Sequence, residues 1–254
     1  MNYSVKISIV TVTYNDKEHL RKTLDSLIKQ KYKDYESIVV DGASSDGTVE
    51  LLKEYEKKMD GKMRWVSEKD DGLYYAINKG IGMAKGEVIG LLYDEYANDD
   101  VLNKIVSCFE KTKCDVVHGD LVYMDENENI IRYWEMGTGN IKSGWMAAHP
   151  TLYVKKEVYD KYGLYNTSYR GGADYEFEVR IFKDNNLRVE YIHNVLIKMF
   201  YGGTSTNGLK GYWRSFKEGV IALRSLGVKH PILINMKRVL IVAKQFMSRK
   251  KLTI

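Results

Sequence analysis

Short apolar runs alternate with longer, more polar stretches through the first half of the chain. The runs are continuous and rich in β-branched residues, which is typical of strands buried on both faces of a sheet. They predict strands over residues 6–12, 36–41, 64–66, 88–92 and 115–119. The stretches between them predict helices over residues 16–30, 46–57, 74–84 and 101–110. This alternation predicts an α/β fold, in which a mostly parallel central sheet carries helices on both faces.

The pattern changes after residue 120. The elements predicted there are a hairpin over residues 123–134 and helices over residues 154–162 and 173–184. From about residue 212 the chain is predicted to be helical, with Pro231 dividing two helices. We therefore expect a main domain over residues 1–210 and a C-terminal helical tail over residues 211–254.

Composition narrows the class of protein. The 254 residues are 44% apolar, which is enough for one large α/β domain with a sizeable core. Cys108 and Cys114 match neither a CxxC redox motif nor a zinc pair, and they fit a reducing cytoplasm. Residues 1–12 lack the pattern of a signal peptide, and no apolar stretch reaches the roughly 18 residues of a membrane span. We therefore expect a cytoplasmic protein.

Three acidic positions carry the candidate chemistry. Asp41 ends the second predicted strand, Asp94 and Glu95 follow the fourth, and Asp174 comes after a Gly-Gly-Ala segment at a helix start. Strand ends in an α/β sheet open onto a common cleft, so these carboxylates can converge there. One can hold a nucleobase, one a metal, and one can take a proton. The chain lacks GxGxxG at its first strand–helix turn and lacks GxxxxGK[ST], which disfavours a dinucleotide dehydrogenase and a P-loop nucleotidase.

The order of several short motifs gives a stronger signal than any one of them. In chain order they are Thr11-Val12-Thr13-Tyr14-Asn15, Asp41-Gly42-Ala43-Ser44-Ser45-Asp46-Gly47-Thr48, Asp70-Asp71-Gly72, Asn78-Lys79, Ala173-Asp174-Tyr175 and Gly202-Gly203-Thr204-Ser205. Over roughly residues 5–206 the chain resembles family 2 glycosyltransferases with the GT-A fold, a Rossmann-like fold. It looks most like bacterial enzymes that build capsule, exopolysaccharide or lipopolysaccharide.

That resemblance implies an inverting glycosyltransferase. Such an enzyme moves a sugar from a nucleoside diphosphate sugar, here a UDP-sugar, to a glycan or lipid-linked acceptor. Residues 1–120 would form the nucleotide-binding half, and residues 121–210 the acceptor half. Asp174 would be the general base, and Asp94 with Glu95 would bind Mn²⁺ or Mg²⁺. The residues expected to bind the nucleotide sugar are Thr11, Val12, Tyr14, Asp41, Asp71, Asn78, Lys79, Tyr93 and His149.

Several of these residues have a structural alternative. The segment after Asp41 also forms a tight turn and a helix cap, Lys79 could be a solvated lysine, and His149 a structural histidine. Asp99 and Asp100 compete with Asp94 as an acidic pair, but we interpret them as a helix cap. Arg180 is expected to pair with a local acid, Glu176 or Glu178, and residues 202–206 are either a lid or a turn.

The acidic motif departs from the family pattern, because Tyr93 and Glu95 stand where acids or aspartates are usual. The alternative function is therefore a nucleotide-sugar-binding protein with impaired catalysis.

The tail over residues 211–254 is basic and amphipathic, and the chain carries a net charge of +5. It could lie on an anionic membrane surface at the inner face of the plasma membrane. It could instead pack on the main domain or on a second subunit, forming a homo-oligomer. No nucleic-acid-binding motif is present, so nucleic acid is not an expected partner.

Overall fold

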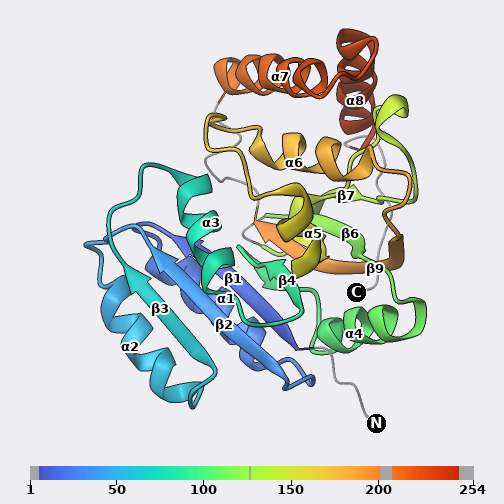
Figure 1. Ribbon diagram of the computed structural model, residues 1–254. Coiled ribbons are helices and arrows are strands. Elements are labelled where there is room, and N and C mark those ends of the chain that lie inside the picture. The colour runs from blue at the N-terminus through green and yellow to red at the C-terminus, as the bar shows by residue number, and fades with distance from the viewer. Residues whose placement is uncertain (1–5, 126, 201–207, 246–254) are drawn as a thin grey trace.

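The computed structural model describes residues 6–125, 127–200 and 208–245, and in that part of the chain it contains one nine-stranded sheet (Figure 1). The strands are β1 (Ile7–Thr13), β2 (Tyr35–Asp41), β3 (Met63–Ser67), β4 (Val88–Leu91), β5 (Glu95–Tyr96), β6 (Val116–Met124), β7 (Ile130–Trp134), β8 (Tyr153–Lys155) and β9 (Val189–Phe200). The α-helices are α1 (Lys17–Ile28), α2 (Thr48–Lys58), α3 (Leu73–Met83), α4 (Val101–Thr112), α5 (Lys156–Tyr162), α6 (Ala173–Phe182), α7 (Gly208–Ser225) and α8 (Pro231–Gln245).

The first half of the sheet is parallel, as predicted. The strand order is β3-β2-β1-β4-β8-β6-β9-β5, with β7 paired to β6. β1 pairs in parallel with β2 and β4, and β2 pairs in parallel with β3. Thr13 lies opposite Asp41, and Asp41 lies opposite Ser67, so these three strands end level with one another. Their carboxyl ends therefore open onto the same side of the molecule.

Helices cover both faces of this sheet, which confirms the predicted architecture. Apolar side chains of α1, α2 and α4 form one core with the sheet, represented by Leu24, Leu52 and Ile105. Those of α3, α5, α6 and α7 form a second core, represented by Ile77 and Phe177. The two cores are separate because strands such as β2 are buried along their whole length, with side chains alternating between the faces.

The second half of the sheet is mixed, and its strands were predicted less well. The predicted hairpin is confirmed as β6 and β7, but β6 is longer than the strand predicted at residues 115–119. The helix predicted from residue 154 begins instead at Lys156, because β8 is buried as an antiparallel strand between β4 and β6. β9, which pairs in parallel with β6, was not predicted.

The tail is helical and divided at Pro231, as predicted. Pro231 is the first residue of α8, where a proline costs no hydrogen bond. Ala222 and Leu223 of α7 are fully buried in the core that also contains α6. The described part of the tail thus packs on the main domain. Among the described helices, none combines the length and the apolar character needed to span a bilayer. Residues 202–206 lie outside the described part of the chain.

The helix α4 begins at Val101, as predicted, but its capping contact differs from the prediction. Asp100 occupies the N-cap position, but its side chain accepts no capping hydrogen bond, and Asp99 lies 3.1 Å from the Lys31 ammonium. The side chain of Gln30 takes the capping role from outside the helix. Its amide oxygen accepts a hydrogen bond from the Leu102 N–H at 3.1 Å, and its amide nitrogen donates to a backbone carbonyl, that of Asn98, at 2.6 Å.

This contact makes a prediction about stability. Gln30→Ala leaves a buried N–H and a carbonyl without their partner, and it should lower the free energy of unfolding by about 1–3 kcal/mol. Asp100→Ala removes no capping bond and should change it by less than about 0.5 kcal/mol. Urea unfolding of the two variants measures the difference. A larger loss in Asp100→Ala would restore the aspartate as the cap.

Candidate active site

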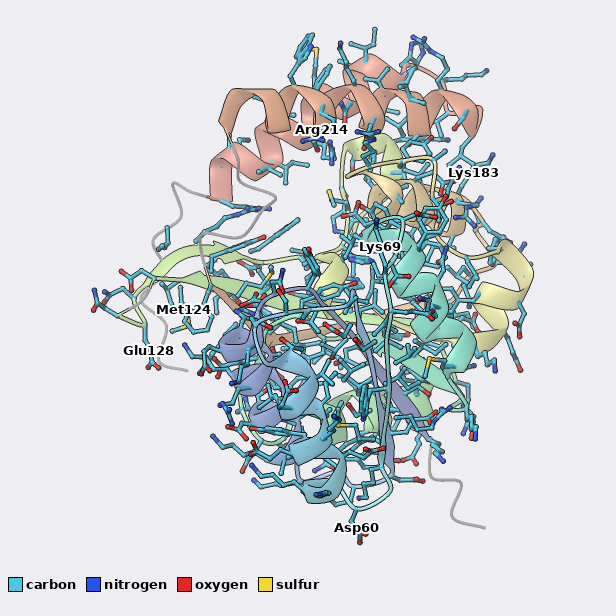
Figure 2. All side chains as sticks on the ribbon, turned by 90° about the vertical axis from the view of Figure 1, so that its left-hand side faces the viewer. Asp60, Lys69, Met124, Glu128, Lys183 and Arg214 are labelled. Atoms are coloured by element: carbon cyan, nitrogen blue, oxygen red, sulfur yellow. The ribbon has the colours of Figure 1, made fainter. Side chains whose placement is uncertain are left out.

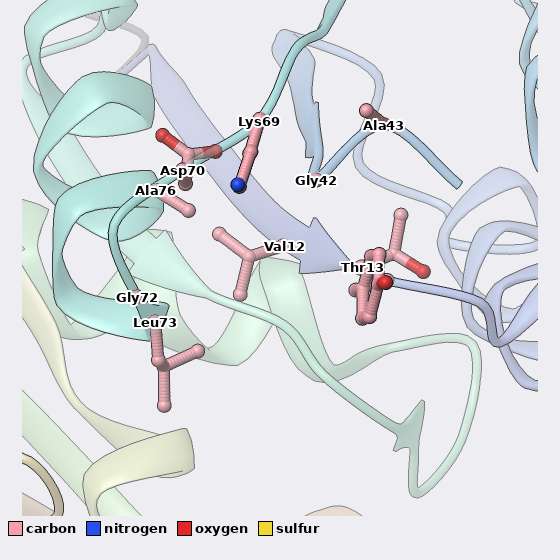
Figure 3. A pocket seen from close by; sticks show the side chains of 10 residues that line it. Val12, Thr13, Gly42, Ala43, Lys69, Asp70, Gly72, Leu73 and Ala76 are labelled. Carbon is pink, nitrogen blue, oxygen red and sulfur yellow. The ribbon is translucent and has the colours of Figure 1, made fainter.

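A cavity of about 510 Å³ opens at the carboxyl ends of β1 and β2 (Figure 3). This volume is within the usual range for a small-molecule site. The lining comes from the end of β1, the segment after β2, the loop between β3 and α3, and the first turn of α3. The lining residues are Val12, Thr13, Tyr14, Gly42, Ala43, Lys69, Asp70, Gly72, Leu73 and Ala76.

Hydrogen bonds between two loops shape one wall of the cavity. The Asn15 N–H donates to Ser44 Oγ at 2.7 Å, and Asn15 Oδ1 accepts from the Ser45 N–H at 2.8 Å. The ring of Tyr14 lies against Gly42, where an added Cβ would come within 3.1 Å of the ring. Tyr14 is 66% exposed, so the rest of its ring is open to a ligand. The prediction thus located Tyr14 at the cavity.

Val12 also lines the cavity, whereas Thr11 is buried. The hydroxyl of Thr11 has no hydrogen-bond partner in the described structure. Of these two predicted residues, only Val12 lines the cavity.

Asp41 is fully buried behind the segment that carries Gly42 and Ala43. Its carboxylate accepts hydrogen bonds from the Ser44 N–H at 3.1 Å, from the Ser44 hydroxyl, and from the Ser67 hydroxyl at 2.6 Å. It therefore holds the cavity wall to the end of β3. Direct contact between Asp41 and a nucleobase requires this segment to move, because the carboxylate has no exposed surface.

The charged residues at the cavity differ from the prediction. Lys69 and Asp70 line it, and Lys69 extends into it (Figure 3). Asp71 is exposed and lies outside the lining. Lys79 does not line the cavity either, because its ammonium is held 2.6 Å from the carboxylates of both Glu68 and Asp70. Lys69 and Asp70 thus take the places expected for Lys79 and Asp71.

Asn78 has a structural contact in place of the predicted one. Its side-chain amide donates to the Tyr165 carbonyl at 2.8 Å and accepts from the Tyr165 N–H at 3.0 Å. Both ends of the amide are therefore used to join α3 to the segment that precedes α6.

Asp174 lies beside α3, the helix that begins in the cavity wall. The Tyr74 hydroxyl of α3 donates to Asp174 Oδ1 at 3.3 Å. Burial, together with the negative charge of Asp174, raises the pKa of Tyr74 well above its usual value, so the phenol stays protonated and donates. This contact joins residues 100 positions apart and brings Asp174 to the helix whose first turn lines the cavity.

The other acids of α6 are less suited to act as a base. Glu176 lies 2.9 Å from the Arg180 guanidinium, which confirms one of the two pairings expected for Arg180. Glu178 is fully buried, and burial raises its pKa well above the usual value, with the charge of Asp174 adding to the effect. Asp174 is half-buried, so it alone of the three can reach an acceptor without breaking a salt bridge or leaving the core.

Glu218 on α7 holds the segment before Asp174. Its carboxylate accepts hydrogen bonds from the Gly171 N–H at 3.0 Å and the Arg170 N–H at 3.4 Å. A Cβ on Gly172 would come within 3.0 Å of the Glu218 side chain, so a larger residue there would require Glu218 to shift. No motif pointed to Glu218, because it lies on the tail and its contacts form only in the folded chain.

Two predicted nucleotide-sugar residues are packed in the interior. His149 accepts or donates a hydrogen bond with the Tyr165 hydroxyl at 2.8 Å, and burial lowers its pKa, which keeps the ring neutral. The Tyr93 ring stacks on His149, and its hydroxyl is buried with no hydrogen-bond partner in the described structure. Neither residue lines the cavity. For His149 the structural alternative is the one that the geometry favours.

Asp94 is buried and paired with a histidine that sequence reasoning missed. His19 Nε2 lies 3.0 Å from Asp94 Oδ1 and 2.8 Å from the Tyr93 carbonyl. The Phe200 N–H donates to the same Asp94 oxygen at 3.2 Å. The hydrogen bond to Asp94 raises the pKa of His19 to about 9, against the opposing effect of burial, so His19 is cationic at neutral pH.

Glu95 is half-buried in β5, where it lies opposite Lys198 of β9. Within the described residues, no group of three or more His, Cys, Asp or Glu side chains is placed to hold a metal ion by itself. The donor set still fits a metal bound mainly by a substrate, because Mg²⁺ commonly takes one or two carboxylates and completes its shell with phosphates and water. Asp94 can serve as that carboxylate once His19 releases it.

The fold and the cavity together define an α/β protein with a cavity at the carboxyl ends of its parallel strands, where ligands of such folds bind. Comparison with known families identifies it further, since residues 8–172 match the family described as Glycosyl transferase family 2. The chain belongs to glycosyl transferase family 2, as the order of its motifs predicted.

A curated relative agrees with this assignment, and solved structures show the fold. The chain is 27% identical over 202 residues to a PGL/p-HBAD biosynthesis glycosyltransferase of Mycobacterium tuberculosis, covering 78% of each. It is similar to S. aureus TarS 1–349 in complex with UDP-GlcNAc, with a TM-score of 0.71 at 16% identity over 92% of this chain and 71% of the other. The chain spans 44% of the longer TarS chain. The mannosyltransferase PcManGT from Pyrobaculum calidifontis, in complex with GDP-Man and Mn²⁺, gives a TM-score of 0.62 at 15% identity, over 98% of this chain and 77% of the other. These structures confirm the GT-A fold.

The His19–Asp94 pair predicts a dependence of stability on pH. The pKa of His19 is about 9 in the folded chain and 6.5 as the ordinary value. Its stabilising effect is therefore complete below pH 6.5 and is lost as the pH rises through about 9. The loss should be at most about 3.4 kcal/mol, from roughly 2.5 pKa units at about 1.36 kcal/mol each. Urea unfolding in the presence of a chelator should show this decline in the wild type and a smaller one in His19→Gln. If the free energy of unfolding declines equally in both proteins, the His19–Asp94 pair is not the cause.

Proposed function

We propose that this chain is an inverting glycosyltransferase that transfers a sugar from a UDP-sugar to a hydroxyl of a glycan or lipid-linked acceptor. The observation that carries the proposal is the hydrogen bond from Tyr74 to Asp174, because it sets a partly exposed carboxylate beside the helix that begins in the wall of the cavity. A nucleotide in the cavity would then have its sugar directed toward a base.

The cavity residues suggest how the donor is held. The open face of Tyr14 can stack on the base, with Val12 beneath it, and Lys69 can approach the diphosphate as a cation. Asp41 fixes the wall and would accept a base N–H after the segment at Gly42 moves. The TarS complex with UDP-GlcNAc supports a UDP-sugar as the donor.

The buried hydroxyl of Tyr93 also fits this proposal. It is unpaired in the described structure, and the charge of Asp174 contributes to raising its pKa, with burial as the main cause. A buried donor without a partner costs free energy, and a hydroxyl of the bound sugar would remove that cost. Because Tyr93 does not line the cavity, it is proposed to contact the sugar only after its packing against His149 opens. No donor contact is proposed for Asp71, Asn78, Lys79 or His149.

The reaction is a single displacement. The acceptor hydroxyl gives its proton to the Asp174 carboxylate while its oxygen forms a bond to the anomeric carbon. The bond between that carbon and the diphosphate oxygen breaks with its electron pair, and the nucleoside diphosphate leaves. Attack from the opposite face inverts the anomeric centre. Tyr74 keeps the carboxylate oriented by donating to one of its oxygens.

A divalent cation, Mn²⁺ or Mg²⁺, would be held by Asp94, with Glu95 in reach through water, and would stabilise the negative charge of the leaving diphosphate. The PcManGT complex, which contains Mn²⁺, supports this proposal. His19 supplies the positive charge beside Asp94 in the chain itself, so Asp94 is not left as an uncompensated buried charge.

The biological setting is proposed from a relative. The name of the mycobacterial protein, a PGL/p-HBAD biosynthesis glycosyltransferase, supports a biosynthetic role. Bacterial surface glycans are the proposed products, with capsule, exopolysaccharide and lipopolysaccharide as the proposed types. The proposed location is the cytoplasm, where nucleotide sugars are made.

The general-base assignment makes a prediction about turnover. A donor is first chosen by thermal shift from a panel of UDP-Glc, UDP-Gal, UDP-GlcNAc and GDP-Man with Mn²⁺, because a ligand of the folded state raises the melting temperature. Asp174→Asn should keep the wild-type shift and lose about 10²–10⁴ in the rate of transfer or donor hydrolysis.

Asp160→Asn, an exposed change on α5, is the matched control and should keep full activity. Turnover of Asp174→Asn within a few-fold of wild type would remove Asp174 from this role. Donor binding without any turnover in the wild type would favour the impaired binding protein, and no shift with any donor would refute the proposed function.

The metal assignment makes a separate prediction. Mn²⁺ should increase the affinity for UDP in the wild type. In Asp94→Asn the increase should be about tenfold smaller, a difference of about 1.4 kcal/mol in binding free energy. The asparagine keeps an acceptor for the Phe200 N–H, so the change acts mainly on charge. Asp100→Asn should bind as the wild type does. Calorimetry with Mn²⁺ and with a chelator measures both, and an equal Mn²⁺ effect in Asp94→Asn would rule Asp94 out.

A further inference from the structure

The helix α8 carries an apolar stripe that faces solvent. Its members are between 46% and 60% exposed, and they are Ile232, Leu233, Met236, Val239 and Leu240. Their spacing places them on one side of an α-helix, an arc of roughly a third of its circumference. These side chains do not contribute to the core. A contiguous apolar patch on the surface usually marks a site of interaction, so the stripe requires a separate explanation.

The inward side of α8 is fixed by its own contacts. Asn235 is fully buried and donates from its side chain to the Phe216 carbonyl of α7 at 2.9 Å. Ile234 is buried in the same core as α6. Arg238 donates to Asn235 and lies over the Tyr175 ring, 4.3 Å from its centroid. These contacts set the rotation of the helix, so the apolar stripe cannot turn inward.

Basic residues surround the stripe. Lys237 and Lys244 follow Leu233 and Leu240 by four residues, so each lysine lies one helical turn beyond a stripe residue. Lys229 and Arg224 are exposed and line a hollow of about 670 Å³ at the turn between α7 and α8. Within residues 211–245 of the sequence the sole acid is Glu218, whose carboxylate accepts hydrogen bonds from Arg170 and Gly171. We call α7, α8 and the turn between them the α7–α8 hairpin. Its outer surface therefore carries both positive charge and exposed apolar side chains.

We propose that the outward surface of the α7–α8 hairpin docks on an anionic phospholipid bilayer. The apolar stripe would enter the boundary between headgroups and acyl chains, and the surrounding lysines and arginine would contact lipid phosphates. Figures 1 and 2 show both helices at one end of the molecule, beyond α6 and opposite to the end at Asp60, so a flat surface can approach them. This proposal concerns binding alone and does not rest on the transfer reaction.

Charge decides between a bilayer and a second copy of the chain. Pairing two copies through this surface would bring Lys237 and Lys244 of one copy near the basic side chains of the other, with Glu218 already engaged. Like charges placed together oppose such an interface. The phosphates of an anionic bilayer can pair with these cationic side chains, and its acyl region can bury the apolar ones.

The test is sedimentation of the full chain with vesicles. Wild type should bind vesicles of phosphatidylcholine containing about one quarter phosphatidylglycerol at least tenfold more tightly than vesicles of pure phosphatidylcholine, and high salt should weaken that binding. Leu233→Glu/Leu240→Glu should reduce binding to the anionic vesicles at least tenfold. Leu164→Glu, at a leucine that is 41% exposed in the loop after α5, is the control and should bind as the wild type does.

Circular dichroism first establishes that the variants are folded, and the single variant Leu240→Glu replaces the double one if it is not. No binding of the wild type to anionic vesicles, or equal binding of wild type and folded variant, would overturn the proposal. Dimerisation in analytical ultracentrifugation that Leu240→Glu abolishes, without vesicle binding by the wild type, would also overturn it in favour of a second copy.

Discussion

The level ending of three parallel strands is the constraint on which the site depends. Thr13, Asp41 and Ser67 lie side by side across β1, β2 and β3, so the loops after these strands start from one line. Hydrogen bonds then hold the loops together, from Ser67 to Asp41 and from Asn15 to Ser44. A shift of one residue in either pairing would move a side chain such as Asp41 to the other face of the sheet.

The sequence was sufficient for the part of the fold that contains β1 to β4. β1, β2 and β4 are buried along most of their length and contain apolar runs, and β3, although half-buried, was found from its short Trp65-Val66 run. Their alternation with helices implied the parallel order. β9 escaped prediction because half-buried residues such as Glu190 and Lys198 interrupt its apolar pattern. β8 was predicted as part of a helix, because three residues are too few to show the alternation of buried and exposed side chains that marks a strand. They form a strand because they pair with β4 on one side and β6 on the other.

For the candidate site, the sequence indicated which segments lie at the cavity, but it did not indicate which side chains contact one another there. Motifs placed Val12 and Tyr14 at the cavity, because a strand end fixes where its next residues lie. They could not place Lys79, since an ion pair with Asp70 depends on how the loop before α3 folds back. The same holds for His19, whose partner Asp94 follows a strand far along the chain. Local pattern contains no information on such pairs, and tertiary structure alone sets them.

The helix α3 contributes a property of the molecule as a whole. It begins in the cavity wall, bonds Asp174 through Tyr74, and holds both backbone groups of Tyr165 through Asn78. Because one rigid helix is attached to both halves of the chain, the halves have no hinge between them at this point. The distance between the cavity and the Asp174 carboxylate is therefore established when the chain folds. The loops and side chains at the cavity, such as the loop at Ala43, are therefore the parts expected to move when a ligand enters.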